Sequence, residues 1–256
     1  QRGGARRRAH GAGRGAGRAV ADAGGGLERQ PRGTAPPPTA ADVAAAVAAA
    51  SRAFKRGEWA AASTAERARV LWRAAALLEA ESGAFAAAES RDTGKPVRLA
   101  AAMDVPRAVA NLRFFAGLVE HGSGGELRHG GGAERSGVDD ALNYTVRKPV
   151  GVVGLVTPWN LPLYLLTWKL APALAMGNAV VAKPSELTPT SATMLAGLLE
   201  RAGLPRGIFN VVHGTGQEAG AALCSHQSVG AVSFTGGSQA GAAVAAAVAP
   251  RFAKLS

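Results

Sequence analysis

Short apolar segments alternate with helical segments in the second half of the chain, and this alternation constrains the fold more than any other feature. Continuous apolar runs of this length are typical of strands buried on both faces; they lie at 152–156, 179–182, 208–212 and 229–234. Helical patterns follow each run, at 161–176, 189–202, 217–223 and 237–248. Strand and helix in strict succession predict an α/β fold, a doubly wound and mostly parallel Rossmann-like sheet. Leu255 begins what we expect to be a fifth strand.

The residues before this region predict an amino-terminal helical segment. Thr39 and Asp42 have the spacing of a helix start, and so do Ser63 and Glu66. Four helices are expected, beginning near 39, 63, 83 and 99, and the last continues to about 120. Residues 121–139 are Gly-rich and predict a loop, whereas 143–150 alternate like a strand.

The charge of the chain is concentrated at its beginning. The 256 residues carry a net charge of +11, but eight arginines and only two acids lie within residues 1–36. Residues 1–38 contain almost no large apolar side chains and predict a disordered Arg/Gly/Ala/Pro-rich leader. An organelle-targeting peptide and an Arg-Gly nucleic-acid arm remain alternatives, although the arm would have no aromatic ring to stack on bases. The remaining residues have the modest charge of an ordinary soluble domain, so we expect no nucleic-acid and no membrane partner.

Polar side chains and glycines follow each expected strand. Ligands of doubly wound sheets bind at the carboxyl ends of the strands. The candidate residues at these ends are Thr157, Pro158, Trp159, Asn160, Lys183, Ser185, Glu186, Gly216, Gly220, Phe234, Thr235, Gly236 and Gly237. The last four lead into a helix, and free N–H groups at a helix start attract a phosphate.

Lys183 and Glu186 have the chemistry of a ribose site, because an ammonium donates to sugar hydroxyls and a carboxylate accepts from them. A carboxylate at this position would repel a 2′-phosphate, which favours NAD over NADP. A solvated ion pair at a helix start is the alternative interpretation.

Four motifs occur in one order along the chain: Pro149–Asn160, Trp168–Asn178, Lys183–Glu186 and Phe234–Gly236. Together they resemble the aldehyde dehydrogenase superfamily, from about residue 40 to the end. Glu89-Ser90 and Asp92–Pro96 fit the amino-terminal helices of that family. The segments 103–106 and 161–168 are most similar to the branch that acts on 2-aminomuconic and related semialdehydes.

The resemblance implies a role for each candidate. Asn160 is similar to the amide that stabilises the oxyanion during attack on the aldehyde, although a helix N-cap is the alternative. Lys183 and Glu186 resemble the ribose contacts of NAD, 234–237 the pyrophosphate turn, and Gly216 with Gly220 the adenine contacts. Thr157, Pro158 and Ser185 belong to the same cofactor-binding motifs. Trp159 and Trp168 resemble residues of the aldehyde tunnel, with core packing as the alternative for Trp168.

The family's nucleophilic cysteine and basic glutamate are expected beyond Ser256. Cys224 is the single cysteine, which excludes an intrachain disulfide, and its context differs from that of the family nucleophile. We therefore expect Cys224 to be a packed residue. The resemblance implies that residues 39–256 form an NAD-binding domain, that the catalytic domain is absent, and that the chain alone is inactive.

The sequence leaves three functional hypotheses open. The first is NAD-dependent oxidation of an aldehyde or semialdehyde by a cytoplasmic homo-dimer or tetramer, in which 121–150 provides an oligomerisation-type hairpin. The second is a catalytically dead nucleotide-binding or co-assembling truncated subunit. The third is an Arg-Gly nucleic-acid binder with an attached domain.

Overall fold

The computed structural model describes residues 40–122, 127–129 and 142–256. The leader, the expected cap at Thr39 and most of the 121–139 loop lie outside the described residues. Among the helices of the described part, none is both long and apolar enough to cross a membrane.

A five-stranded parallel sheet forms the centre of the fold, in the order β5–β4–β3–β6–β7. Its strands are β3 (Val152–Val156), β4 (Ala179–Lys183), β5 (Phe209–Val211), β6 (Val229–Phe234) and β7 (Lys254–Leu255). Every residue of β3 and β4 is buried, as the apolar runs predict. The predicted α/β class and the parallel sheet are therefore confirmed.

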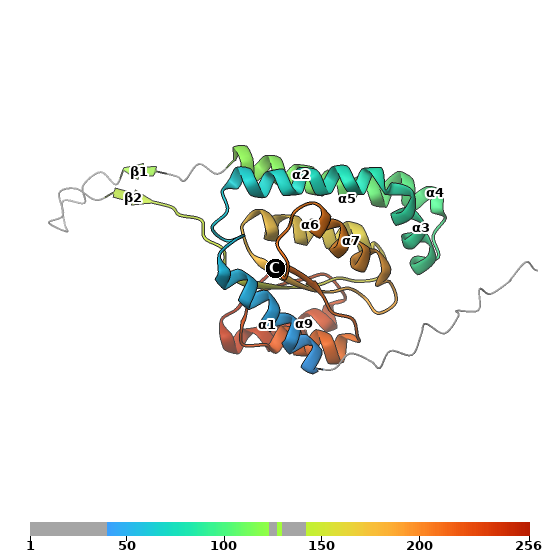
Figure 1. Cartoon of the computed structure of the whole chain (residues 1–256). Coiled ribbons are helices and arrows are strands. Elements are labelled where there is room, and N and C mark those ends of the chain that lie inside the picture. Colours follow the sequence, from blue (N-terminus) through green and yellow to red (C-terminus); the bar gives the residue numbers. More distant parts are fainter. Residues whose placement is uncertain (1–39, 123–126, 130–141) are drawn as a thin grey trace, which may run out of the picture. The chain divides into compact units, whose positions relative to one another are not determined.

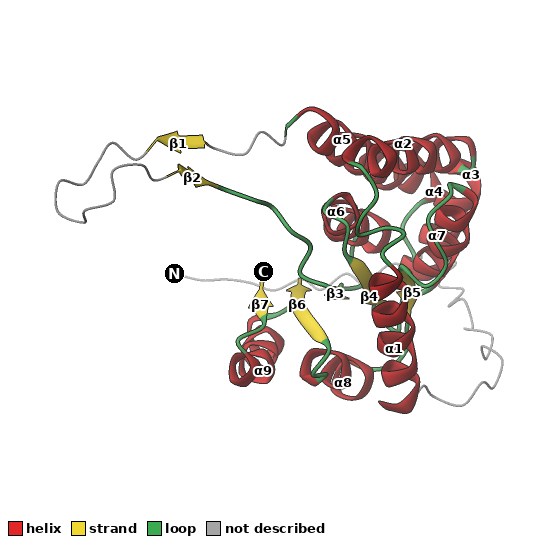
Figure 2. Ribbon diagram, turned by 60° about the vertical axis from the view of Figure 1, so that its left-hand side comes forward, coloured by secondary structure: helices red, strands yellow, loops and turns green. Residues whose placement is uncertain are grey.

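Helices cover both faces of this sheet (Figures 1 and 2). One face packs against α6 (Pro162–Ala175) and α7 (Thr190–Arg201), and the other against α1 (Ala40–Arg56), α8 (Ala221–Ser225) and α9 (Ser238–Val248). The long helices α2 (Thr64–Ala80) and α5 (Val105–His121) lie side by side above α6, and α3 (Ser82–Thr93) follows α2. The sheet is thus doubly wound.

The strand order reverses at β3. The chain moves from β3 outward to β4 and β5, and then crosses back to place β6 on the other side of β3. The carboxyl ends of β3 and β6 adjoin each other, because Val156 pairs with Phe234 and the N–H of Thr235 donates to the carbonyl of Val156 at 3.1 Å. A crevice at such a reversal is where doubly wound sheets bind ligands.

Three sequence predictions of local structure were wrong in detail. Only Leu142–Tyr144 (β2) forms a strand, antiparallel to Leu127–His129 (β1), and residues 145–151 form none. There the Asn178 side chain replaces a partner strand, since its Oδ1 accepts from the N–H groups of Val150 (2.7 Å) and Gly151 (3.2 Å).

The expected helix from 99 to 120 is also interrupted. A short helix, α4 (Val97–Leu99), is followed by the π-helical turn η1 (Ala100–Asp104) before α5 begins. Pro106 in the first turn of α5 has no N–H to donate one turn back, which accounts for a wider turn at this point. A second π-turn, η2 (Gly216–Gly220), precedes α8 where one helix over 217–223 was expected.

Gly154, in the centre of β3, tests the packing of the sheet against α8. A side chain there would meet the Leu223 Cγ atom at 3.2 Å and Val229 Cγ1 at 3.4 Å. We expect Gly154→Val to lower the free energy of unfolding by about 1–3 kcal/mol through overpacking. Gly83→Ala is the control: its position on α3 is exposed with nothing within 4 Å, so about 0.5–1 kcal/mol of stabilisation is expected. Urea unfolding measures both; an unchanged midpoint for Gly154→Val would contradict the close packing.

Candidate functional site

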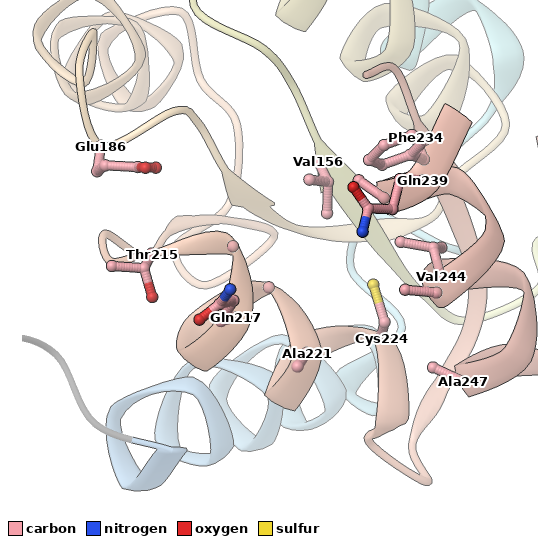
Figure 3. Close-up of a pocket in the computed structure, with 14 residues that line it drawn as sticks. Val156, Glu186, Thr215, Gln217, Ala221, Cys224, Phe234, Gln239, Val244 and Ala247 are labelled. Atoms are coloured by element: carbon pink, nitrogen blue, oxygen red, sulfur yellow. The ribbon is translucent and has the colours of Figure 1, made fainter. Parts of the chain in front are cut away.

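A cleft of about 650 Å³ opens at the carboxyl ends of β3 and β6 (Figure 3). Val156 and Phe234 come from the ends of these two strands, and Glu186 comes from the turn after β4. The remaining lining residues belong to the η2–α8 segment and to α9: Thr215, Gly216, Gln217, Gly220, Ala221, Cys224, Gln239, Ala240, Ala243, Val244 and Ala247. Four predicted site residues, Glu186, Gly216, Gly220 and Phe234, are thus brought to one cleft.

Small side chains form the two long walls of the cleft. On α9 they recur with helical spacing at Ala240, Ala243, Val244 and Ala247, and α8 contributes Ala221 opposite them. Walls of this kind leave a narrow apolar slot, which has the shape to accept a flat ring. The α9 wall could not be predicted from the sequence, because the same spacing is typical of helices that pack in a core.

A charged pair lies at the polar end of the slot. Lys183 is 3% exposed, and its Nζ donates to Oε2 of Glu186 at 3.2 Å. A Cβ at Gly220 would lie 3.7 Å from Cδ of Lys183, so Gly220 packs against the buried lysine stem, whereas only Glu186 of the pair lines the cleft. Partial burial acts to raise the pKa of Glu186, but a hydrogen bond from its own N–H and the Lys183 ammonium outweigh it, and the pKa is lowered. Glu186 is therefore a carboxylate at neutral pH.

The start of α9 provides free backbone donors beside the cleft. Gly237 occupies the N-cap position, and no side chain caps the helix there. A side chain at Gly236 would place its Cβ 2.4 Å from Cζ of Phe234, so glycine is required for Phe234 to fold over this turn. The first N–H groups of an eleven-residue helix thus remain available to an anion.

The other predicted cofactor residues lie at the strand ends without lining the cleft. Thr157 is 3% exposed, and its Oγ1 has no hydrogen-bond partner among the described residues. Ser185 is buried, and its Oγ accepts from the N–H of Leu187 at 3.3 Å. Pro158 is half-buried, and Thr235 with the two glycines that follow it forms the turn before α9.

Asn160 lies in an exposed bend between β3 and α6. The alternative that it caps α6 is wrong, because the helix begins at Pro162 and the N-cap position belongs to Leu161, whose side chain makes no capping bond. The Asn160 carbonyl accepts a hydrogen bond from Nζ of Lys95 at 3.3 Å. A residue of the amino-terminal helical segment thus contacts the backbone of this bend.

The two tryptophans near this bend are exposed. Trp159 is 56% exposed and Trp168 49%, so core packing is the wrong interpretation for Trp168. One edge of Trp168 packs against Phe115 of α5, with ring centroids 5.7 Å apart.

Comparison with known proteins shows which family shares this sequence. A family model described as "Aldehyde dehydrogenase family" matches residues 27–256. The chain belongs to the aldehyde dehydrogenase family. It is 49% identical over 219 residues to 2-aminomuconic semialdehyde dehydrogenase of Danio rerio, which covers 85% of this chain and 43% of that protein. It is 47% identical over 210 residues to 2-hydroxymuconic semialdehyde dehydrogenase of a Pseudomonas strain, covering 82% of this chain and 42% of that protein.

Solved aldehyde dehydrogenases share the fold. Betaine aldehyde dehydrogenase of Staphylococcus aureus in complex with NAD+ matches with a TM-score of 0.78 and 36% identity, over 85% of this chain and 42% of that one. The indole-3-acetaldehyde dehydrogenase AldA of P. syringae, in complex with NAD+ and IAA, matches with a TM-score of 0.79 and 34% identity, over 85% and 42%. The chain thus spans about two fifths of the length of the relatives it matches.

Cys224 does not have the surroundings of a nucleophile. Its side chain lines the cleft between α8 and α9, with the sulfur directed inward (Figure 3), yet the residue is only 1% exposed. Burial raises the pKa of the thiol, and nearby Arg251 only partly offsets this effect. Among the described residues, no group of three or more His, Cys, Asp or Glu side chains could hold a metal ion.

We expect the Cys224 thiol to react with a thiol reagent such as DTNB on the order of 100-fold more slowly in the folded chain than in urea. Burial limits access, and the raised pKa reduces the thiolate fraction at pH 8. The release of the coloured product measures both rates. Equal rates in the folded and unfolded chain would contradict the buried position.

Proposed function

We propose that this chain is the NAD-binding part of an enzyme that oxidises an aldehyde or semialdehyde to the carboxylic acid. One observation carries the proposal: an apolar slot, a Lys–Glu pair whose glutamate lines that slot, and an uncapped helix start occur together at one strand-order reversal. These three features match the chemistry of adenine, ribose and pyrophosphate, which are joined in that order in NAD. NAD-bound relatives of the same fold support the assignment.

Each part of the cleft would hold one part of the dinucleotide. The adenine would enter the slot between α8 and α9, where Gly216 and Gly220 permit close approach. Lys183 would donate to a ribose hydroxyl and Glu186 would accept from one. Thr235, Gly236 and Gly237 would bring the pyrophosphate to the start of α9. Thr157, Pro158, Trp159 and Ser185 would support the two strand ends that border the cofactor.

Glu186 favours NAD over NADP. Its lowered pKa keeps it ionised, and it lies at the ribose end of the slot. A 2′-phosphate here would face a carboxylate that Lys183 neutralises only in part. Repulsion between two anions in a partly buried cleft costs more than it would in water.

Asn160 is the residue of this chain that we assign to the reaction itself. When a nucleophile attacks an aldehyde carbon, negative charge develops on the carbonyl oxygen, and the Asn160 side-chain N–H would donate to that oxygen. NAD, when bound, supplies the hydride acceptor. Trp159 and Trp168 expose apolar surface, and we propose that they help to exclude water from the aldehyde.

The substrate class and assembly form the finer part of the proposal. Relatives named for 2-aminomuconic and 2-hydroxymuconic semialdehyde support a semialdehyde substrate. We further propose that residues 39–256 form one NAD-binding domain, and that the enzyme acts as a homo-dimer or tetramer. The alternative is a nucleotide-binding or co-assembling subunit without chemistry, for which buried Cys224 is the favourable observation.

Nucleotide binding provides the first test. We expect the chain to bind NAD in calorimetry and to bind NADP at least about tenfold more weakly, a difference of about 1.4 kcal/mol. Glu186→Gln should lower NAD affinity about tenfold, because it removes a charged acceptor for a ribose hydroxyl. The ratio of NAD affinity to NADP affinity should also fall, because the substitution removes the carboxylate that repels a 2′-phosphate. Glu200→Gln, an exposed position on α7, is the matched control and should bind like the original chain. A folded chain without saturable NAD binding would refute the proposed cofactor site.

Catalysis provides the second test. We expect the 256-residue polypeptide, incubated with NAD and an aldehyde, to produce no NADH above the uncatalysed background. Its single cysteine is buried and has a raised pKa, so no accessible thiolate is available to attack the aldehyde. Absorbance at the NADH band measures the product. Production of NADH that Cys224→Ala abolishes would overturn our assignment of this residue.

A further inference from the structure

A buried ion pair lies next to the bend that carries Asn160. Nζ of Lys95 is 2.6 Å from Oδ2 of Asp104, and the two side chains are 15% and 2% exposed. The same Nζ donates to the carbonyl of Asn160 at 3.3 Å. One ammonium therefore connects the amino-terminal helical segment to the backbone of the residue that we assign to the oxyanion.

The backbone around Lys95 is held in place by local hydrogen bonds. Gly94 ends α3 in the left-handed region at φ +79°, which turns the chain at this point. Oγ of Ser90 donates to the carbonyl of Lys95 at 2.7 Å, and the N–H of Lys95 donates to Oγ1 of Thr93 at 3.3 Å. The lysine side chain thus extends from a constrained backbone.

Asp104 owes its position to the π-turn. It is the last residue of η1, and the wider turn places it opposite Lys95 across the contact between α3 and η1. π-turns within helices are frequent at functional sites because they redirect one side chain. Glu89 is another carboxyl group that interacts with Lys95 and Asp104, and it is 1% exposed. Burial raises the pKa of Glu89, and Asp104 is the carboxyl group in direct contact with Nζ of Lys95, at 2.6 Å.

We propose that Lys95, held by Asp104, is a positioning residue that fixes the bend at Asn160 through its backbone carbonyl. An exposed bend lacks the hydrogen bonds of a helix or strand and would otherwise sample several conformations. An oxyanion donor is effective only when its position is fixed before the reaction. The significance for catalysis depends on the proposed function of Asn160, whereas the contact itself can be measured without it.

The sequence permits a selective measurement. A chain labelled with carbonyl-¹³C asparagine and ¹⁵N leucine gives a signal only at an Asn–Leu pair, and there are two: Asn160–Leu161 and Asn111–Leu112. The second pair lies on α5 and serves as an internal control. The ¹³C shift of the Asn160 carbonyl reports its hydrogen bond, and the order parameter of the Leu161 amide reports the rigidity of the bend.

Removal of Lys95 alone would leave Asp104 as an unpaired buried charge, so the test variant is Lys95→Met/Asp104→Leu, which replaces the pair by apolar side chains. We expect the Asn160 carbonyl shift to move upfield and the Leu161 order parameter to fall from about 0.85 to below about 0.6. Asn111–Leu112 should not change. Lys148→Met, an exposed position, should leave both pairs unchanged.

Lys95→Arg covers the case in which the double variant does not fold. Arginine keeps a positive charge beside Asp104. Its guanidinium pairs with a carboxylate through two N–H groups, so we expect it not to place a donor where Nζ of Lys95 contacts the Asn160 carbonyl. The same upfield shift is expected at Asn160. An unchanged shift and order parameter in the folded Lys95 variants would overturn the proposal. A titration of the original chain with NAD separates the two hypotheses, because its failure refutes the cofactor site and leaves the contact of Lys95 intact.

Discussion

The parallel pairing of β3 with β4 on one side and β6 on the other is the constraint on which the site depends. β3 is buried over its whole length, so its register with both neighbours is specified by close packing on two faces. That register places Val156 opposite Lys183 and Phe234. The three strands therefore end at one level, and the last residues of β3 and β6 line one cleft with Glu186, which follows β4.

The cleft and the Asn160 bend both lie at the carboxyl ends of the strands, but different elements build them. The cleft is built from turns and helix faces, where small residues on α9 and α8 leave space and Lys183 with Glu186 adds polarity. The bend follows β3 directly but depends on Lys95, which the π-turn and Asp104 hold in place. The nucleotide binding and the orientation of Asn160 that we propose would thus be served by separate parts of the chain.

Much of the fold could be predicted from local pattern. Apolar runs identified the strands, and Ser63 with Glu66 identified the start of α2, where both bonds of the capping box are present. The strand expected over 143–150 ends at Tyr144 because alternation alone does not provide a partner, and Asn178 accepts from the N–H groups of Val150 and Gly151 instead. The π-turns at η1 and η2 were missed because their hydrophobic pattern differs little from that of an α-helix.

The sequence by itself determined the order of strands and helices and the chemical groups that follow each strand, because hydrophobic periodicity and turn residues act over a few neighbouring positions. Only the tertiary structure decided which of these groups meet. Lys95 and Asn160 are 65 residues apart, and the α9 wall of the cleft faces a helix from another part of the chain. Such contacts result from the packing of whole elements around β3, and a pattern over a few neighbouring residues does not predict them.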